Sequence, residues 1–231
     1  MTLTIYNAED IPQGSDAWLE ARRGIVTAST IGQLITAKTL KPAKNDTARG
    51  LIETLAAEQV TGRVEPIYAN AAMERGNRDE PWARHEYEKA TGSNVTEVGF
   101  IRLDTAEFTV GYSPDGLVGD NGLIEIKSRA PRIQMRTILA DEVPATNMAQ
   151  IMCGLYVTGR EWLDYVSYSN GMPLYIKRVH PDDTWFLAIE NAMDEFTIAA
   201  NAITDAYAIR ATSMHRTEYI DHDAGEEITL G

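Results

Sequence analysis

The hydrophobic positions along the chain follow two different periods. Apolar residues recur every three to four positions in some segments, as on the buried face of a helix, and alternate or form short runs between turn residues in others, as in strands. The first pattern predicts helices near 15–23, 28–37, 46–60, 70–91, 132–141, 146–158 and 182–209. The second predicts strands near 97–103, 108–113, 116–119, 123–128, 162–168 and 174–179. The order of these elements favours an α/β (α+β) fold.

The domain organisation follows from length and pattern. The chain has 231 residues, enough for one domain with a substantial core. We expect a single domain over 1–210, followed by an acidic C-terminal tail over 211–231 that carries no clear periodicity.

Candidate chemistry is concentrated in the middle strands. The segment 113–116 (Ser-Pro-Asp-Gly) is a polar bend between strand pieces, and 120–122 (Asp-Asn-Gly) is a strong hairpin turn that precedes the next strand. Since side chains alternate between the faces of a strand, Glu125 and Lys127 share one face, and the two neighbouring isoleucines share the other. Asp115 lies in the bend just before this hairpin.

Two carboxylates that converge on one face suit a hard cation that prefers oxygen ligands, and Mg²⁺ fits this description better than Zn²⁺. Asp115 and Glu125 are therefore candidate metal ligands, and Lys127 is a candidate partner of the attacking water or of phosphate charge. The alternative is an ordinary solvated ion pair on an exposed strand, because a Glu-x-Lys pair also arises by chance.

A third carboxylate is predicted from the helix near 70–91. Glu80 is the only charge in its stripe, and a carboxylate that faces a core needs a metal or a cationic partner. A shift of one position would instead turn Asp79 inward and leave Glu80 in water, and Pro81 could kink or break the helix here. The stripe at helical spacing consists of Ala72, Gly76, Glu80, Ala83 and Tyr87.

The N-terminal region offers a phosphate-binding pattern. A predicted helix ends at Gly24, and a second helix opens near 27–29. Arg22 and Ser29 flank this junction, and an arginine with a hydroxyl at a helix N-terminus suits a phosphate. The two residues could equally be a helix-end cation and an ordinary helix cap.

These features together resemble the lambda-exonuclease family of phage recombination nucleases, which includes the YqaJ-like viral recombinases. This family is a branch of the restriction-endonuclease-like PD-(D/E)XK superfamily, so the resemblance implies that fold, with a mixed central sheet flanked by helices. It extends over about residues 13–180. The matching positions, in order, are Trp18, Arg22, Gly24, Thr27-Ala-Ser29, Gly76, Glu80, Ser113-Pro-Asp115-Gly116, Glu125-x-Lys127, Met148-Ala-Gln150 and Val157-Thr158.

The resemblance also implies residue roles. It implies a metal site formed by Glu80, Asp115, Glu125 and the backbone carbonyl of Ile126. Lys127 would assist the attacking water. The remaining implied roles are a pocket for a terminal 5′ phosphate formed by Arg22, Ser29 and Ser113, a glutamine near the catalytic centre at Gln150, and an apolar strand-separation residue at Met73.

The implied activity is a Mg²⁺-dependent exonuclease, with Mn²⁺ able to replace the metal, that degrades the 5′-ended strand of linear duplex DNA. The resemblance further implies a homotrimeric ring around DNA ends and a phage single-strand annealing protein as partner. The chain departs from the family pattern in 38–46 and beyond Asp182, which affects the expected DNA contacts and the subunit interface.

Composition changes this picture in two ways. The net charge of −13 argues against a protein that simply coats DNA, because neutralisation of phosphates by Lys and Arg dominates such binding. Basic residues are nevertheless concentrated in 18–49 and 125–136, whereas the segment after Asp182 is strongly acidic, so a basic path for DNA remains available. No apolar run is long enough to span a membrane and no signal pattern opens the chain, so we expect a cytoplasmic protein. The resemblance to phage enzymes implies the cytoplasm of a bacterial host. The single cysteine, Cys153, is expected to be a buried packing residue.

Two other readings remain open at this stage. One is a junction-resolving or restriction-type endonuclease, which would need no pocket for an end phosphate. The other is a module of the same fold that binds DNA ends without cutting them, which would not need the intact set of Glu80, Asp115, Glu125 and Lys127.

Overall fold

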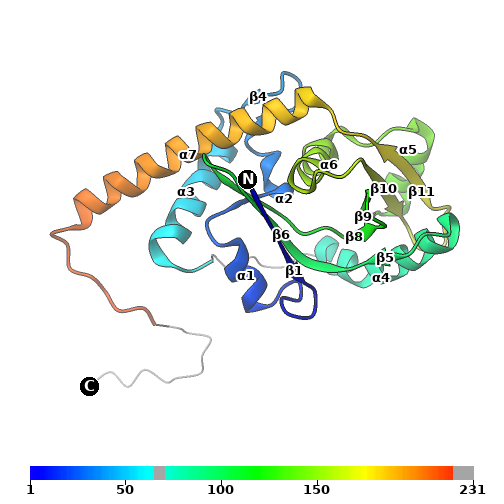
Figure 1. Cartoon of the computed structure of the whole chain (residues 1–231), viewed down its shortest axis with the longest axis horizontal. Helices are drawn as coiled ribbons and strands as arrows, with labels where there is room; N and C mark the ends of the chain where they lie inside the picture. The colour runs from blue at the N-terminus through cyan, green and yellow to red at the C-terminus, as the bar shows by residue number, and fades with distance from the viewer. Residues whose placement is uncertain (65–70, 221–231) are drawn as a thin grey trace.

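The computed structural model describes residues 1–64 and 71–220 (Figure 1). The helices are α1 (Asp16–Arg22), α2 (Ala28–Ile31), α3 (Asp46–Thr61), α4 (Ala71–Thr91), α5 (Pro131–Ala140), α6 (Ala145–Thr158) and α7 (Asp183–Ala211). The strands are β1 (Thr2–Asn7), β2 (Val26–Thr27), β3 (Ile35–Thr36), β4 (Lys41–Pro42), β5 (Val95–Thr96), β6 (Val98–Asp104), β7 (Thr109–Tyr112), β8 (Gly116–Val118), β9 (Gly122–Ser128), β10 (Trp162–Tyr168) and β11 (Tyr175–Val179).

The strands form two larger sheets and a small hairpin. The first sheet has the order β1-β6-β7-β2, and the second has the order β11-β10-β9-β8-β5. Each sheet is mixed, because β2 runs parallel to β7 and β9 runs parallel to β10, while the other pairs in these sheets are antiparallel. The predicted α/β fold with mixed strands flanked by helices is confirmed.

Strand β9 is covered on both faces. Ile124 and Ile126 pack against Ala83 and Tyr87 of α4, whereas Leu123 belongs to the main core together with α6. Alternation along the strand therefore divides its apolar residues between two helical layers. Any polar side chain in the middle of β9 is consequently held in a largely water-free environment.

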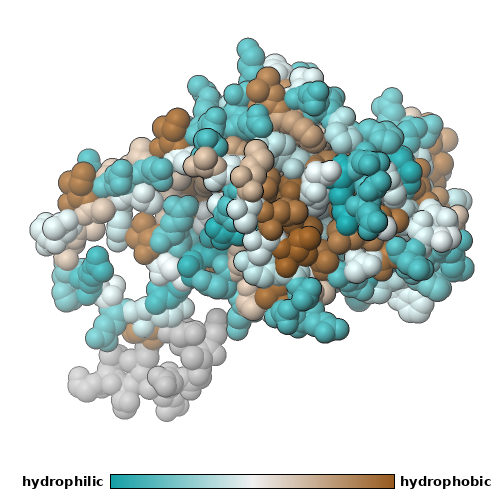
Figure 2. Space-filling model, in the orientation of Figure 1, coloured by the Kyte–Doolittle hydropathy of each residue, from teal (hydrophilic) through white to brown (hydrophobic). Residues whose placement is uncertain are grey.

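Helix α7 combines a buried part with a projecting part. Its N-terminal half packs against α3 and α6, and its last turns extend away from the body of the protein (Figure 1). Figure 2 shows a mainly hydrophilic face with scattered hydrophobic residues, some of which lie along this projecting end. The exposed apolar side chains there are Ile198, Ile203, Tyr207 and Ile209.

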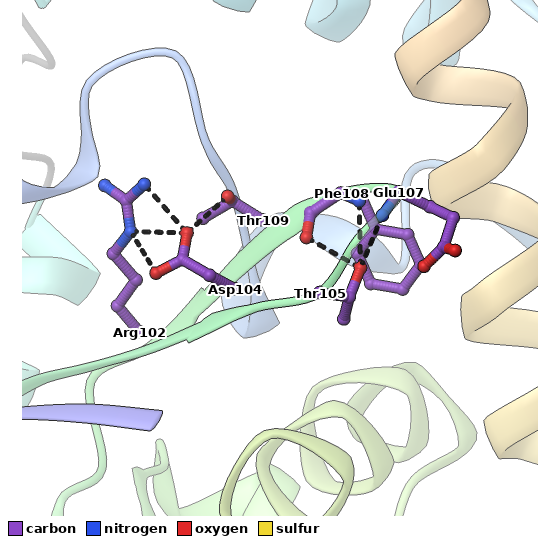
Figure 3. Close-up of polar contacts among 6 residues, drawn as sticks. All are labelled: Arg102, Asp104, Thr105, Glu107, Phe108 and Thr109. Atoms are coloured by element: carbon purple, nitrogen blue, oxygen red, sulfur yellow. Dashed lines mark hydrogen bonds and ion pairs between the residues drawn. The ribbon is translucent and has the colours of Figure 1, made fainter. Parts of the chain in front are cut away.

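The hairpin between β6 and β7 is closed by side chains (Figure 3). Asp104 accepts hydrogen bonds from Arg102 Nε at 2.9 Å and from Thr109 Oγ1 at 2.7 Å. The Thr105 hydroxyl accepts from the backbone N–H of Phe108 at 2.9 Å, which closes the turn itself. These contacts fix the start of β7, the strand that leads into the Ser-Pro-Asp-Gly bend.

Two parts of the prediction were wrong. The helix expected over 28–37 is only the short α2, because the chain turns after Gly32 and continues into the β3–β4 hairpin. Ile31, Leu34 and Ile35 are all buried, so a turn and a strand place them in the core at positions that imitate a helical period. Strands β1 to β5 were not predicted: the apolar residues of β1 are exposed on an edge strand, and β2 to β5 are each only two residues long.

Other predicted elements agree with the structure to within two residues at each end within the described ranges. Helix α4 passes through Pro81 without a break, and the predicted helix start at Asn70 lies outside the described residues. None of the helices in 1–64 and 71–220 has both the length and the apolar character that crossing a bilayer requires.

Candidate active site

Asp115 and Glu125 come together because the β8–β9 hairpin folds back on itself. Glu125 lies in the middle of β9, opposite Tyr165 of the parallel strand β10. Asp115 precedes β8, and its Oδ2 atom accepts a hydrogen bond of 2.5 Å from the backbone N–H of Ile126. This hydrogen bond holds the bend against β9 and fixes the carboxylate of Asp115 beside that of Glu125. The same Ile126 residue supplies the backbone carbonyl expected as a further metal ligand.

Glu125 and Lys127 share one face of β9, as alternation requires. The Nζ atom of Lys127 lies 2.6 Å from Oε1 of Glu125, whose side chain is 1 % exposed. Oε1 is thus a buried carboxylate oxygen whose charge is balanced by the Lys127 ammonium. The Tyr112 hydroxyl lies 3.4 Å from Oε2. Gly154 of α6 allows Tyr112 to pack there, since a Cβ at that glycine would come within 2.8 Å of the ring.

Glu80 reaches the same region from α4. Its Oε1 atom accepts a hydrogen bond of 2.7 Å from NH2 of Arg84, one turn further along the helix. Neither of the two expected faces of the helix is fully buried or fully exposed here, because Asp79 and Glu80 are both half-buried. Asp79 accepts a hydrogen bond from the Ser128 hydroxyl at the end of β9, so each of the two carboxylates has its own partner.

The pKa values of Asp115, Glu80 and Lys127 are shifted by burial and by the neighbouring charges. Burial, followed by repulsion from Glu125 and Glu80, raises the pKa of Asp115 well above its usual range. The pKa of Glu80 is raised by burial, although Arg84 opposes the shift. Burial alone would lower the pKa of Lys127, but the carboxylates of Glu125 and Asp115 outweigh it and raise this pKa. The three carboxylates therefore repel one another in a buried place, an arrangement that a cation would relieve.

The donor set fits a hard divalent cation in kind, since it consists of carboxylate oxygens, one of them a buried oxygen of Glu125 that already lies 2.6 Å from the Lys127 ammonium. Within 1–64 and 71–220, however, no three His, Cys, Asp or Glu side chains are grouped closely enough to enclose a metal ion. Lys127 and Arg84 balance the charge of Glu125 and Glu80 instead. The arrangement is that of three mutually repelling carboxylates, two of which are paired with neighbouring cations.

The three residues expected to bind a 5′ phosphate are connected through Trp18 and Thr27. The Nε1–H group of Trp18 donates to the Ser113 hydroxyl at 2.9 Å, and the guanidinium of Arg22 stacks on the Trp18 ring at 3.8 Å. Arg22 also donates a long hydrogen bond of 3.4 Å to the Thr27 hydroxyl, which lies 3.0 Å from that of Ser29.

This cluster has a structural cause. Strand β2 pairs with β7 in parallel, with Thr27 opposite Gly111, so Ser29 and Ser113 follow the ends of neighbouring strands. Burial lowers the pKa of Arg22 to about 10, with Glu58 opposing the shift, so the guanidinium is still charged near neutral pH. A buried cation with hydroxyl neighbours is a plausible anion-binding arrangement.

The other predicted positions lie apart from this network. Gln150 is half-buried on α6, and no hydrogen bond in the described ranges links it to Asp115, Glu125 or Lys127. Met73 is exposed near the start of α4, two turns before Glu80. The sequence analysis gave Arg84 no role, although its position four residues after Glu80 was a usable signal for a helical ion pair.

Comparison with known proteins places the chain in a family. The profile of the YqaJ-like viral recombinase domain matches residues 17–161, more than half of the chain. No protein among the curated sequences compared matches it. Among solved structures, an alkaline exonuclease (LHK-Exo) from Laribacter hongkongensis is 33 % identical, with a TM-score of 0.76 over 86 % of this chain and 98 % of that chain.

Two further structures resemble the chain. The complex of LHK-Exo with dAMP has a TM-score of 0.75 at the same identity and coverage. A phage-related exonuclease from Haemophilus somnus 129PT has a TM-score of 0.59 over 79 % of this chain and 96 % of that chain, and at 12 % identity it supports the fold alone. The fold is thus restriction-endonuclease-like, and the family and these relatives support a nuclease. The chain belongs to the YqaJ-like viral recombinase family.

Proposed function

We propose that this protein is a Mg²⁺-dependent exodeoxyribonuclease that degrades the 5′-ended strand of linear duplex DNA in the 5′ to 3′ direction. The observation that carries the proposal is the bend between β7 and β8. Ser113 of the phosphate cluster and Asp115 of the carboxylate cluster lie two residues apart in this bend, which spans at most about 7 Å of chain. A terminal phosphate bound at Ser113 would therefore place the next phosphodiester near Asp115.

The residues divide the chemistry between them. Asp115, Glu125, Glu80 and the carbonyl of Ile126 would hold Mg²⁺, which supplies polarisation of the phosphate and a more acidic bound water. Lys127, half-buried beside Glu125, would orient the attacking water and offset negative charge on the phosphate as the reaction proceeds. Gln150 is the expected further contact near the reacting phosphate, and Met73 is the candidate for separating the strands.

The bond changes explain why the pocket reads a 5′ phosphate repeatedly. Water attacks the phosphorus of the first internal phosphodiester, and the bond from phosphorus to the 3′ oxygen of the terminal nucleotide breaks. The released mononucleotide carries the old 5′ phosphate and a new 3′ hydroxyl. The shortened strand keeps the attacked phosphorus as its new 5′ phosphate, which Arg22, Ser29 and Ser113 can bind in the next cycle. The similar protein LHK-Exo has been solved in complex with dAMP, a mononucleotide of the kind that this reaction would release.

The proposed product is a 3′ single-stranded overhang for phage homologous recombination, and the proposed partner is a phage single-strand annealing protein. Two observations support a homotrimeric ring around the DNA. The exposed apolar residues along the end of α7 would gain from a covering surface. The concentration of basic residues in 18–49 and 125–136, on a chain with a net charge of −13, is compatible with a basic lumen.

The competing functions predict different outcomes of one experiment. Linear duplex DNA, labelled at either the 5′ or the 3′ end of one strand and 5′-phosphorylated or not, is incubated with and without Mg²⁺ beside a closed circle. We expect early release of the 5′ label as a mononucleotide, faster from phosphorylated ends, only with Mg²⁺ and with the circle intact. Cutting of the circle would support an endonuclease, and end binding without digestion would support a non-catalytic module.

A further inference from the structure

Arg84 makes three contacts with three different partners. Its NH2 atom donates to Oε1 of Glu80 at 2.7 Å, and its NH1 atom forms an ion pair with Glu97 at 2.6 Å. Its Nε atom donates to the backbone carbonyl of Asp115 at 3.1 Å. One planar side chain thus joins α4, the link between β5 and β6, and the bend before β8.

The burial and geometry of Arg84 differ from those of an ordinary surface ion pair. Its side chain is only 12 % exposed, and all three of its guanidinium nitrogens are engaged. A guanidinium has a rigid fork of donors, so fixing one partner restricts the direction of the other two. The contact with Asp115 is to its backbone, which leaves the carboxylate of that residue directed by the N–H of Ile126.

We propose that Arg84 is a positioning residue that holds the Glu80 carboxylate and the Asp115 backbone in the mutual orientation that metal binding requires. This inference rests on the proposed function, since it takes Glu80 and Asp115 to be metal ligands. Arg84 binds no metal and contacts no substrate. Outer hydrogen-bond partners of this kind orient carboxylate ligands, and their loss typically reduces metal affinity or activity by about 10- to 100-fold.

Arg84 could instead compete with the metal for Glu80, and the observed contacts argue against this. Arg84 occupies only Oε1 of Glu80, and the Ile126 N–H occupies only Oδ2 of Asp115. Within the described residues no hydrogen bond engages the second oxygen of either carboxylate, Oε2 of Glu80 or Oδ1 of Asp115. The side chain of Glu80 is also 24 % exposed. Each carboxylate can therefore offer an oxygen to a metal while its existing contact persists.

The test measures metal binding directly as well as digestion. Mn²⁺ is titrated into the full chain and the free ion is followed by electron paramagnetic resonance, for the wild type and for Arg84→Met. We expect the Mn²⁺ concentration at half saturation to rise about 10- to 100-fold in the variant. The Mg²⁺ concentration for half-maximal digestion should rise in parallel, while digestion at saturating Mg²⁺ recovers much of the wild-type rate.

A matched control separates positioning from general stability. Arg178 also bridges to a buried carboxylate, with two hydrogen bonds of 2.8 Å to Asp164, which is 3 % exposed, but it lies on β11 away from the carboxylate cluster. Arg178→Met should lower the melting temperature and leave the Mn²⁺ midpoint unchanged. If Arg178→Met shifts the midpoint as far as Arg84→Met does, the effect is loss of stability and the inference is overturned.

The remaining outcomes are also decisive. Arg84→Lys keeps the charge but not the fork, so it should give a smaller rise in the midpoint, and it provides the test if Arg84→Met does not fold. An unchanged or lower Mn²⁺ midpoint in a folded Arg84 variant overturns the inference while the proposed function stands. A wild-type chain that neither binds Mn²⁺ nor digests DNA removes the proposed function, and the inference is lost with it.

Discussion

Replacing Arg22 by alanine tests whether the cluster of Arg22, Ser29 and Ser113 recognises a 5′ phosphate. In the structure the guanidinium lies on the Trp18 ring, and its hydrogen bond to the Thr27 hydroxyl is long at 3.4 Å. A guanidinium has five N–H donors, so Arg22 can donate to a phosphate while it keeps this contact. We expect Arg22→Ala to slow digestion of phosphorylated ends selectively.

The size of the effect can be worked out from these contacts. A hydrogen bond to a charged group contributes about 1.5–3 kcal/mol. Because each 1.36 kcal/mol changes a rate constant tenfold, kcat/KM on phosphorylated ends should fall by about 10- to 150-fold. Loss of the stacking of Arg22 on Trp18, worth about 0.5–1 kcal/mol at an exposed site and more when buried, affects both kinds of end equally. The ratio between the two substrates therefore isolates the phosphate contact.

The assay compares kcat/KM on 5′-phosphorylated and 5′-hydroxyl duplexes of the same sequence. Arg23→Ala is the matched control, since Arg23 is the neighbouring residue and pairs with Glu20 on the surface. Trp18→Phe removes the donor to Ser113 and leaves a smaller ring under Arg22. The ratio between the two substrates should show a loss of phosphate preference of about 2- to 13-fold, the equivalent of one hydrogen bond of 0.5–1.5 kcal/mol. Equal slowing of both substrates by Arg22→Ala would refute the reasoning.

Four further predictions concern the catalytic residues, the stability of the fold, the cysteine and the assembly. Lys127→Ala and Asp115→Asn should abolish digestion while circular dichroism shows a folded chain, and wild-type rates in either variant would contradict the site. Because the pKa of Asp115 is higher in the folded state than in the unfolded state, the fold loses stability as the pH rises above the pKa of the unfolded state. Asp115→Asn should therefore raise the melting temperature at neutral pH, and a lower melting temperature would count against this. Burial raises the pKa of the Cys153 thiol to about 12, so an alkylating reagent at pH 8 should label it only after denaturation, and rapid labelling of the native protein would disprove its burial. Light scattering should give a mass near three chains, whereas a stable monomer would exclude the ring.

The sequence predicted best where local chemistry and periodicity agreed. Strand alternation was enough to place Glu125 and Lys127 on one face of β9, and the helical stripe was enough to bring Glu80 towards the same region. The sequence did not reveal the parallel pairing of β2 with β7, which depends on contacts between segments far apart in the chain. It was also misleading at 28–37, because buried residues in a turn and a short strand imitated a helix.

The side-chain partners were the least predictable part of the site. Trp18 and Thr27 entered the sequence analysis only as positions shared with a family, whereas the structure gives each a hydrogen bond to a member of the phosphate cluster. Arg84 had a visible helical partner in Glu80, but its contact with the carbonyl of Asp115 joins residues 31 positions apart. Such contacts depend on how two sheets and two helices meet, and no local pattern encodes that.

The bend at 113–115 connects the two larger sheets, because β7 belongs to one and β8 to the other. Trp18 of α1 holds Ser113 at one end of this bend, and Arg84 of α4 holds the carbonyl of Asp115 at the other. A bend fixed at both ends keeps a constant separation between the residue that would bind the terminal phosphate and the residue that would help to hold the metal. In the proposed reaction this separation determines which phosphodiester is cut. Removal of one nucleotide per cycle would then follow from the rigidity of three residues between two anchored sheets, without any contact to the bases.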